Sequence, residues 1–187
     1  MQPGMCLFYI LVNLYIQAAE TMSKATPVKC HECGQYHAWD AIEVIFEFPD
    51  AYFKIHEEER ADRVQMNKEI CIVDGVHHIR GVVPVKTTLA DKPVYHWGVW
   101  VKVEPEAFAV IYDNWDVEDQ SHLTLKGKLA NEIRYYGNTR NKAIRIQPIS
   151  NKTRPHFYFT RDQRLMEIQN KKVTARTLMS IFHYHFD

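Results

Sequence analysis

The sequence is short of glycine, of net charge and of long apolar runs, and each shortage argues against a class of protein. Only 7 of its 187 residues are glycine and 8 are proline, with no Gly-, Ser- or Pro-rich linker, so collagen-like and low-complexity chains are excluded. Basic and acidic residues number 23 each, so no overall field attracts nucleic acid or an anionic membrane. The one strongly apolar run, Met5–Ile16, is shorter than the roughly 20 residues of a bilayer-spanning helix.

Common catalytic motifs are also missing. The chain has no glycine-rich phosphate loop and no series of parallel strand–helix–strand units, which argues against nucleotide-binding folds. It has no H-E-x-x-H sequence and no paired-carboxylate motif, and no serine or cysteine has the partner motif of a nucleophile. The sequence therefore predicts a fold class and one metal site more readily than an activity.

Enough apolar sequence is present to build a core. Hydrophobic residues make up 46% of the chain and aromatic residues 12%, and 187 residues is a typical length for one domain. The charge is uneven, because residues 120–187 contain 13 basic and 4 acidic side chains. These basic residues are scattered through strand-like sequence, so we interpret them as packing beside the acidic remainder and not as a nucleic-acid patch.

The first 28 residues are predicted to lie outside the domain and to add little to its core. Met5–Ile16 is apolar on nearly every side and has no basic flank. The segment is either an upstream extension, with translation starting at Met22, or a targeting segment. We expect a cytoplasmic domain over residues 29–187, or a secreted or envelope protein if residues 1–21 are a genuine signal segment.

The pattern of the remaining sequence predicts a single α+β domain. Asp74-Gly75 is a turn dipeptide between two apolar stretches and predicts a hairpin. Strands joined by hairpins, with few helices, indicate a mainly antiparallel sheet with two or three helices and an N-terminal cysteine knuckle. We expect strands at residues 41–48, 70–73, 78–86, 94–103, 122–129, 143–149 and 156–160. We expect helices at residues 56–67, at residues 104–115 and after residue 174.

The sequence CHECGQYH, residues 30–37, has the spacing of a metal knuckle. The thiols of Cys30 and Cys33 are separated by two residues and can bind one tetrahedral ion, and Gly34 permits the tight knuckle turn that directs both sulfurs inward. A closed structural zinc site needs two more ligands, and His37 and Cys71 are the best candidates. The predicted cofactor is therefore structural zinc.

Three other interpretations of these residues stay open. His31 or His77 replaces one of the ligands, or the knuckle holds no metal and Cys71 is an apolar residue buried in a strand. A redox C-x-x-C pair is the third, but such a pair opens a helix beside a parallel strand unit, which this sequence does not supply.

A group of polar residues surrounds the predicted hairpin. Asp74, His78, Arg80 and His96 supply the acid, base and cation that acid–base catalysis or anion binding requires. In a strand, His78 and Arg80 share a face. The simpler interpretation is that these residues occupy exposed sheet positions and pair with neighbouring charges.

Two tryptophans supply a candidate surface for a partner. Trp97 and Trp100 are three positions apart, so a regular strand directs one to the core and the other to the surface, unless Gly98 introduces a bulge. A surface tryptophan beside Arg80 and His96 is typical of a protein-binding site. We expect most of the other aromatic residues to lie in the core.

The order of several motifs resembles a known family. The chain contains, in order, CHECGQYH, EEERADR, ICIVDGVHHIRGVV, HWGVWVKV, NWD, LKGKLANEI and TRPHFYF. This order resembles the bacterial domain-of-unknown-function family 2199 over about residues 29–172. The sequence after the Arg-Pro pair, FTRDQRLMEIQ, differs from the acidic stretch containing proline and histidine that is usual there. The resemblance implies a compact bacterial domain without an established activity.

Two classes of function follow from these residues. The preferred one is a non-catalytic, zinc-stabilised binding module of the accessory or immunity type, which recognises another protein. It is favoured because catalytic motifs are missing, charge is neutral and tryptophan and tyrosine are abundant. The alternative is a small enzyme using Asp74, His78, Arg80 and His96, and it requires these four side chains to converge on one cavity.

Overall fold

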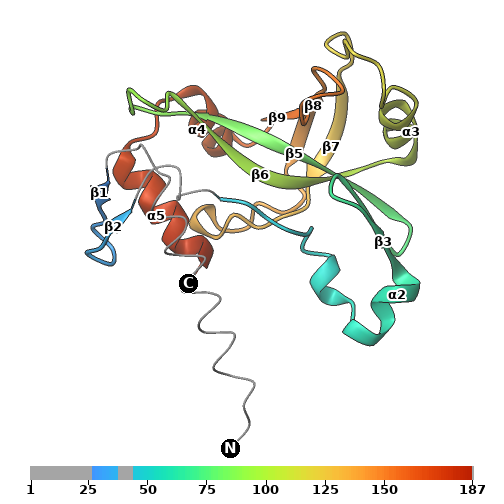
Figure 1. Cartoon of the computed structure of the whole chain (residues 1–187), viewed down its shortest axis with the longest axis horizontal. Coiled ribbons are helices and arrows are strands. Elements are labelled where there is room, and N and C mark those ends of the chain that lie inside the picture. Colours follow the sequence, from blue (N-terminus) through green and yellow to red (C-terminus); the bar gives the residue numbers. More distant parts are fainter. Residues whose placement is uncertain (1–26, 38–43, 187) are drawn as a thin grey trace, which may run out of the picture. The chain divides into compact units, whose positions relative to one another are not determined.

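The computed structural model describes residues 27–37 and 44–186. The chain divides into two compact units, residues 1–42 and residues 43–187, drawn in Figure 1. The expected boundary at residue 29 falls inside the first unit. The apolar run at residues 5–16, the translation start and the targeting segment lie outside the described residues, as does the beginning of the strand expected at 41–48.

The described part of the first unit is a small antiparallel hairpin. Its strands are β1 (Val28–Lys29) and β2 (Tyr36–His37), which pair in antiparallel register. Between them, the Cys30 amide donates to the Gln35 carbonyl at 2.6 Å and the Gly34 amide donates to the Cys30 carbonyl at 3.0 Å. Gly34 has φ +74°, a left-handed conformation that glycine adopts without steric cost. The expected cysteine knuckle is therefore formed.

The second unit contains a seven-stranded sheet that closes on itself. Neighbouring strands pair antiparallel in the order β3 to β9, and a parallel pair between Val82 of β5 and His156 of β9 joins the sheet back to its middle. The two longest strands, β5 and β6, cross this unit in Figure 1. The strands are β3 (Val64–Met66), β4 (Ile70–Val73), β5 (Val76–Lys86), β6 (Val94–Val103), β7 (Leu125–Leu129), β8 (Ala143–Gln147) and β9 (His156–Phe159).

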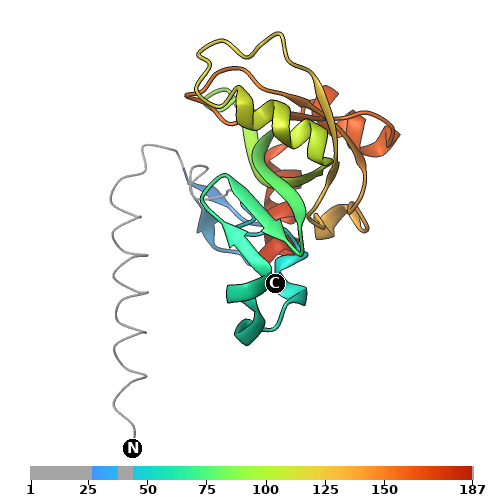
Figure 2. The ribbon, with the colours of Figure 1, turned by 90° about the vertical axis from the view of Figure 1, so that its right-hand side faces the viewer.

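Four helices accompany this sheet. In the views of Figures 1 and 2, α3 and α5 lie at opposite ends of the closed sheet, and α4 packs beside β5 and β9. The helices are α2 (Arg60–Arg63), α3 (Pro105–Asp113), α4 (Gln163–Asn170) and α5 (Ala175–Phe186), with 3₁₀ turns η2 (Tyr52–Lys54), η3 (Glu57–Glu59) and η4 (Arg134–Tyr136). Within residues 27–37 and 44–186, no helix is both long enough and apolar enough to cross a membrane.

The α+β class and the mainly antiparallel sheet are confirmed. The helix expected at 56–67 is wrong in its second half, because residues 64–66 pair with β4 as a strand. Helix α4 was not expected. It begins where the Asp162 carboxylate accepts a hydrogen bond from the Leu165 amide at 3.2 Å, which is the cap that such a helix requires.

Both faces of the sheet carry buried residues. Inside the closed part, Trp97, Val99, Ile146 and Phe157 are completely buried. Gly81 leaves the space that the Phe157 ring fills, because a Cβ at that position would overlap the ring. On the other face, a second apolar cluster covers the sheet, and its buried members are Ile55, Cys71, Val73 and Trp100.

Candidate metal knuckle and hairpin residues

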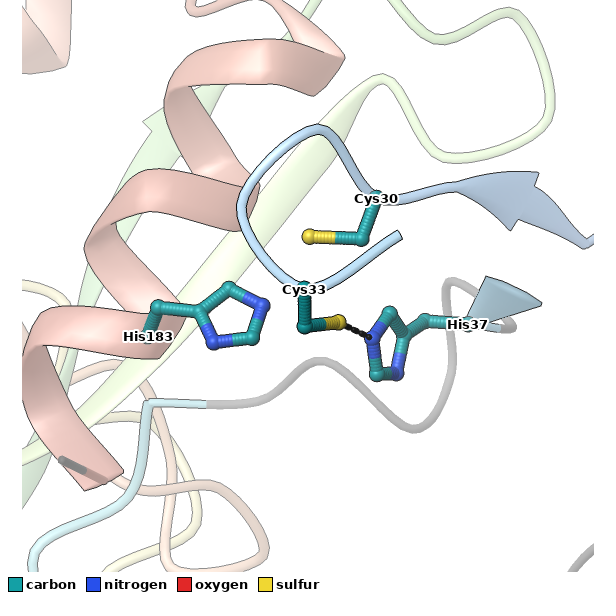
Figure 3. A group of neighbouring side chains, drawn as sticks. All are labelled: Cys30, Cys33, His37 and His183. Atoms are coloured by element: carbon teal, nitrogen blue, oxygen red, sulfur yellow. Dashed lines mark hydrogen bonds between the residues drawn. The ribbon is translucent and has the colours of Figure 1, made fainter. Parts of the chain in front are cut away.

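Three potential metal ligands converge in the first unit. The ligand atoms of Cys30, Cys33 and His37 lie within 4.8 Å of one another. Figure 3 shows the Cys33 thiol directed at the His37 ring, and its Sγ lies 3.2 Å from Nε2. Cys30 is buried and Cys33 is exposed. This triad of soft and borderline ligands suits zinc better than calcium or magnesium, which prefer oxygen.

Local contacts orient the knuckle. The Glu32 amide donates a hydrogen bond to the Cys30 sulfur at 3.3 Å. His31, a possible substitute ligand, directs its Nε2 to the Glu32 carboxylate at 3.0 Å. His77, the other substitute, stacks on Phe108 with 4.3 Å between ring centroids. The pairing of Lys29 with Tyr36 brings the two ends of the loop together, and His37 follows directly.

Cys71 has a different environment from the triad. It lies in β4 of the second unit, completely buried and clustered with Ile55, Val73 and Trp100. Burial raises the pKa of its thiol to about 11, and a raised pKa opposes the thiolate that a metal requires. This is the environment of a buried apolar residue, the alternative that the sequence left open.

His183 is a histidine that the sequence analysis did not single out. It is the fourth side chain drawn in Figure 3, and it belongs to α5 of the second unit. Together with His185 it belongs to an amphipathic helix, and this pair has no ligand spacing that distinguishes His183 from a packed residue.

Asp74 and His78 line one cavity, of about 390 Å³, in the second unit. The Arg63 guanidinium binds both oxygens of Asp74 at 2.8 Å and lowers the pKa of that carboxyl. His78 is buried, with its Nδ1 3.1 Å from the Cys71 carbonyl oxygen. Burial lowers the pKa of His78, so its neutral form is favoured.

Arg80 and His96 do not line the cavity that Asp74 and His78 share. Arg80 lines a second cavity, of about 170 Å³. His96 is exposed, and its ring lies 5.8 Å from that of His156. His78, Arg80 and His96 share one face of the β5–β6 pair, but the register places His78 opposite Lys102 and His96 opposite Pro84, six residues further along β5. A separation of this length is about 20 Å, so the hairpin residues do not line a common cavity.

The expectation that Trp97 or Trp100 reaches the surface is wrong. Both side chains are completely buried, because both faces of β6 are covered. Trp97 occupies the interior of the closed sheet, whereas Trp100 lies in the second apolar cluster. The Trp100 indole donates to the Phe46 carbonyl at 3.1 Å, so the segment before η2 covers it. Neither ring is available to a partner.

Comparison with known proteins gives one match. A family model described as "Uncharacterized protein conserved in bacteria (DUF2199)" matches residues 29–172. The match includes the knuckle, the β4–β5 hairpin and all of β6. No curated protein and no solved structure matches the chain. Because the match covers most of the chain, from the knuckle to the end of α4, this protein belongs to the DUF2199 family of uncharacterized proteins conserved in bacteria.

Proposed function

We propose that this protein is a zinc-stabilised, non-catalytic binding module of the accessory or immunity type, which recognises another protein. The observation that carries the proposal is the convergence of Cys30, Cys33 and His37 within 4.8 Å. Two thiolates and one imidazole are typical zinc ligands, and a tetrahedral ion accepts one further ligand beyond the triad.

A structural role for zinc follows from how little else holds the knuckle together. Its two strands contain two residues each. In the loop between them, Cys30 is buried and residues 31–35 are all exposed. So small an element buries too little apolar surface to offset its conformational entropy, and metal binding commonly supplies the missing folding free energy.

A cluster of three aromatic residues, two half-buried and one exposed, supports the recognition of a protein. The rings of Phe48 and Tyr52 stack at 4.1 Å between centroids, and Phe53 meets Phe48 edge-on at 5.8 Å. The Arg60 guanidinium lies 4.4 Å from the Tyr52 centroid. Phe53 is 65% exposed. Aromatic and arginine side chains carry much of the binding energy in protein interfaces, so we assign the partner surface to this aromatic patch.

The separation of the hairpin residues favours a binding module over an enzyme. Acid–base catalysis requires its groups within hydrogen-bond reach of a shared point, and Asp74 and His78 line a different cavity from Arg80. Asp74 is also held by Arg63. We place the protein in the cytoplasm, because two of its thiols belong to the candidate metal triad and that compartment keeps thiols reduced and able to bind metal.

Metal analysis of the full chain, purified without a histidine tag, tests the zinc proposal. We expect about one zinc per chain, little or none in Cys33→Ser, and an unchanged content in His31→Asn. His31 is the matched control because it is a histidine of the same loop outside the triad. A wild-type zinc content near zero, or one that Cys33→Ser does not lower, contradicts the proposal.

Cross-linking in bacterial cells tests the partner surface. Phe53→Ser is compared with Tyr112→Ser, because Tyr112 in α3 is also 65% exposed but lies outside the patch. We expect the same protein to be cross-linked to the wild type and to Tyr112→Ser, and to be lost with Phe53→Ser. Equal cross-linking of both variants contradicts the assignment of the patch.

A further inference from the structure

The cavity beside Arg80 lies at the point along β5 where its neighbour changes from β4 to β9. On one edge of β5, the Arg80 amide donates to the Glu69 carbonyl at 2.8 Å, just before β4, and the Val82 amide donates to the Pro155 carbonyl at 3.0 Å, just before β9. The segment before β4 and the segment before β9 therefore meet along this edge of β5. The cavity of about 170 Å³ is lined by residues from both segments and from α3 and the chain that follows it.

Among the described residues, Arg80 has an aromatic neighbour, since its Cζ lies 5.8 Å from the centroid of the Trp100 ring, but no carboxylate partner. Glu69, which also lines the cavity, is occupied by Arg154, whose Nε and a terminal nitrogen bind its two carboxylate oxygens at 2.8 Å each. Among the residues that the structure describes, Arg80 has no ion pair and no side-chain hydrogen bond, and its Nε is buried without a partner. Burial and the nearby Arg154 lower the pKa of Arg80, but a guanidinium stays charged at neutral pH.

The walls of the cavity are mainly apolar. They include Ile79 of β5, Ile111 of α3, Trp115, Pro148 and Pro155. A cavity of about 150 Å³ is large enough for one benzene molecule. The other two cations of the lining are already paired, Lys152 with Glu118 and Arg154 with Glu69. The space therefore accepts a body the size of one aromatic ring next to Arg80, a cation that has no carboxylate partner among the described residues.

We propose that this cavity binds a small organic carboxylate whose apolar body is about the size of one aromatic ring. The carboxylate binds the planar guanidinium of Arg80, whose fork of donors matches it, and the ring lies against Ile111 and Trp115. Inorganic phosphate lacks the apolar body and leaves these walls in contact with water. This proposal is independent of the metal knuckle and of the aromatic patch.

An NMR titration of the full chain tests the site. The probes are benzoate and its neutral analogue benzamide, and the reporter is the Trp115 indole resonance, assigned with Trp115→Phe. We expect benzoate to shift this resonance saturably and benzamide to bind at least roughly tenfold more weakly, because only benzoate makes a charge-assisted hydrogen bond. Inorganic phosphate is expected to bind more weakly than benzoate. Equal binding of benzoate and benzamide, or no shift with either, overturns the proposal.

Two variants locate the site. Arg80→Gln should weaken benzoate binding at least roughly tenfold, whereas Arg161→Gln, the matched control at an exposed arginine outside this cavity, should leave it unchanged. If Arg80→Gln does not fold, Ile111→Trp keeps Arg80 and fills the cavity, and it should abolish binding. Unchanged benzoate affinity in either folded variant overturns the proposal.

Discussion

The knuckle of the first unit and the closed sheet of the second are organised by different forces. In the knuckle, residues 31–36 are exposed, and its features are a glycine turn and three clustered side chains of the kinds that can bind a metal. In the sheet, residues such as Trp97, Ile146 and Phe157 are completely buried, and apolar burial stabilises the fold. The comparison teaches that the two units draw on different residues, so we expect that the proposed metal site and the core of the sheet can each be disrupted without the other.

The largest effect is expected from the interior of the sheet. Phe157→Ala removes a completely buried ring that fits against Gly81, and such a change costs about 3–5 kcal/mol. Urea unfolding of the second unit should show this loss, with zinc content unchanged. The control Tyr158→Ala removes the neighbouring half-buried ring on the other face and should cost clearly less. A similar cost for both variants would contradict the assignment of Phe157 to the interior.

Two substitutions of Cys71 distinguish a metal ligand from a buried apolar residue. Cys71→Ser places a hydroxyl among Ile55, Val73 and Trp100, and an unsatisfied buried hydroxyl costs about 1–3 kcal/mol. Cys71→Ala should destabilise less, because it removes the sulfur without adding a polar group. We expect both variants to keep zinc. Loss of zinc in both would show that Cys71 is a ligand after all.

A smaller, pH-dependent effect is expected from buried histidine. Burial lowers the pKa of His78 below that of an exposed histidine, and the pKa of His156 is lowered in the same way. The unfolded chain therefore binds protons first, so the free energy of unfolding falls as the pH drops below about 6.5. Thermal melts between pH 7.5 and 5 should show a shallower dependence for His78→Gln than for the wild type or for His56→Gln, which replaces an exposed histidine. Identical slopes would contradict this origin of the acid sensitivity.

Replacing Cys30 should disrupt the first unit and have the smallest effect of these variants on the stability of the second unit. Cys30→Ser removes a thiol of the triad and should abolish zinc binding and broaden the amide resonances of residues 27–37. The core of the second unit is built from its own residues, so its free energy of unfolding should change by less than about 0.5 kcal/mol. Broadened amide resonances in β5 and β6 would show that disrupting the knuckle also disturbs the second unit.

Local patterns predicted much of this fold. Asp74-Gly75 forms the expected hairpin turn, with both residues at positive φ, because turn chemistry is set by adjacent residues. The Cys30–His37 spacing likewise predicted that Cys30, Cys33 and His37 cluster, since these three of the four predicted ligands lie within one loop. Residues 64–66 escaped prediction because their helical pattern is overridden by pairing with β4, a contact that local propensity does not contain.

The burial of Trp100 and the environment of Cys71 depend on contacts across the chain. Trp100 is buried because the segment carrying Phe46 covers it, and no pattern within β6 indicates that cover. Cys71 is equally plausible as a ligand or as an apolar residue until its neighbours are known. The cavity beside Arg80 also needs the fold, because Glu69 and Arg154, which pair there, are far apart in the sequence.

The pairing of Val82 with His156, which closes the sheet, also affects how the chain reaches this structure. It joins the middle of the chain to a strand near its end, and contacts of such sequence separation slow folding because a long loop must close first. Until β9 docks, β5 and β8 present unpaired backbone to solvent, and exposed strand edges promote self-association. We therefore expect aggregation during refolding to increase with protein concentration and to disappear once closure is complete, which light scattering during stopped-flow refolding can measure.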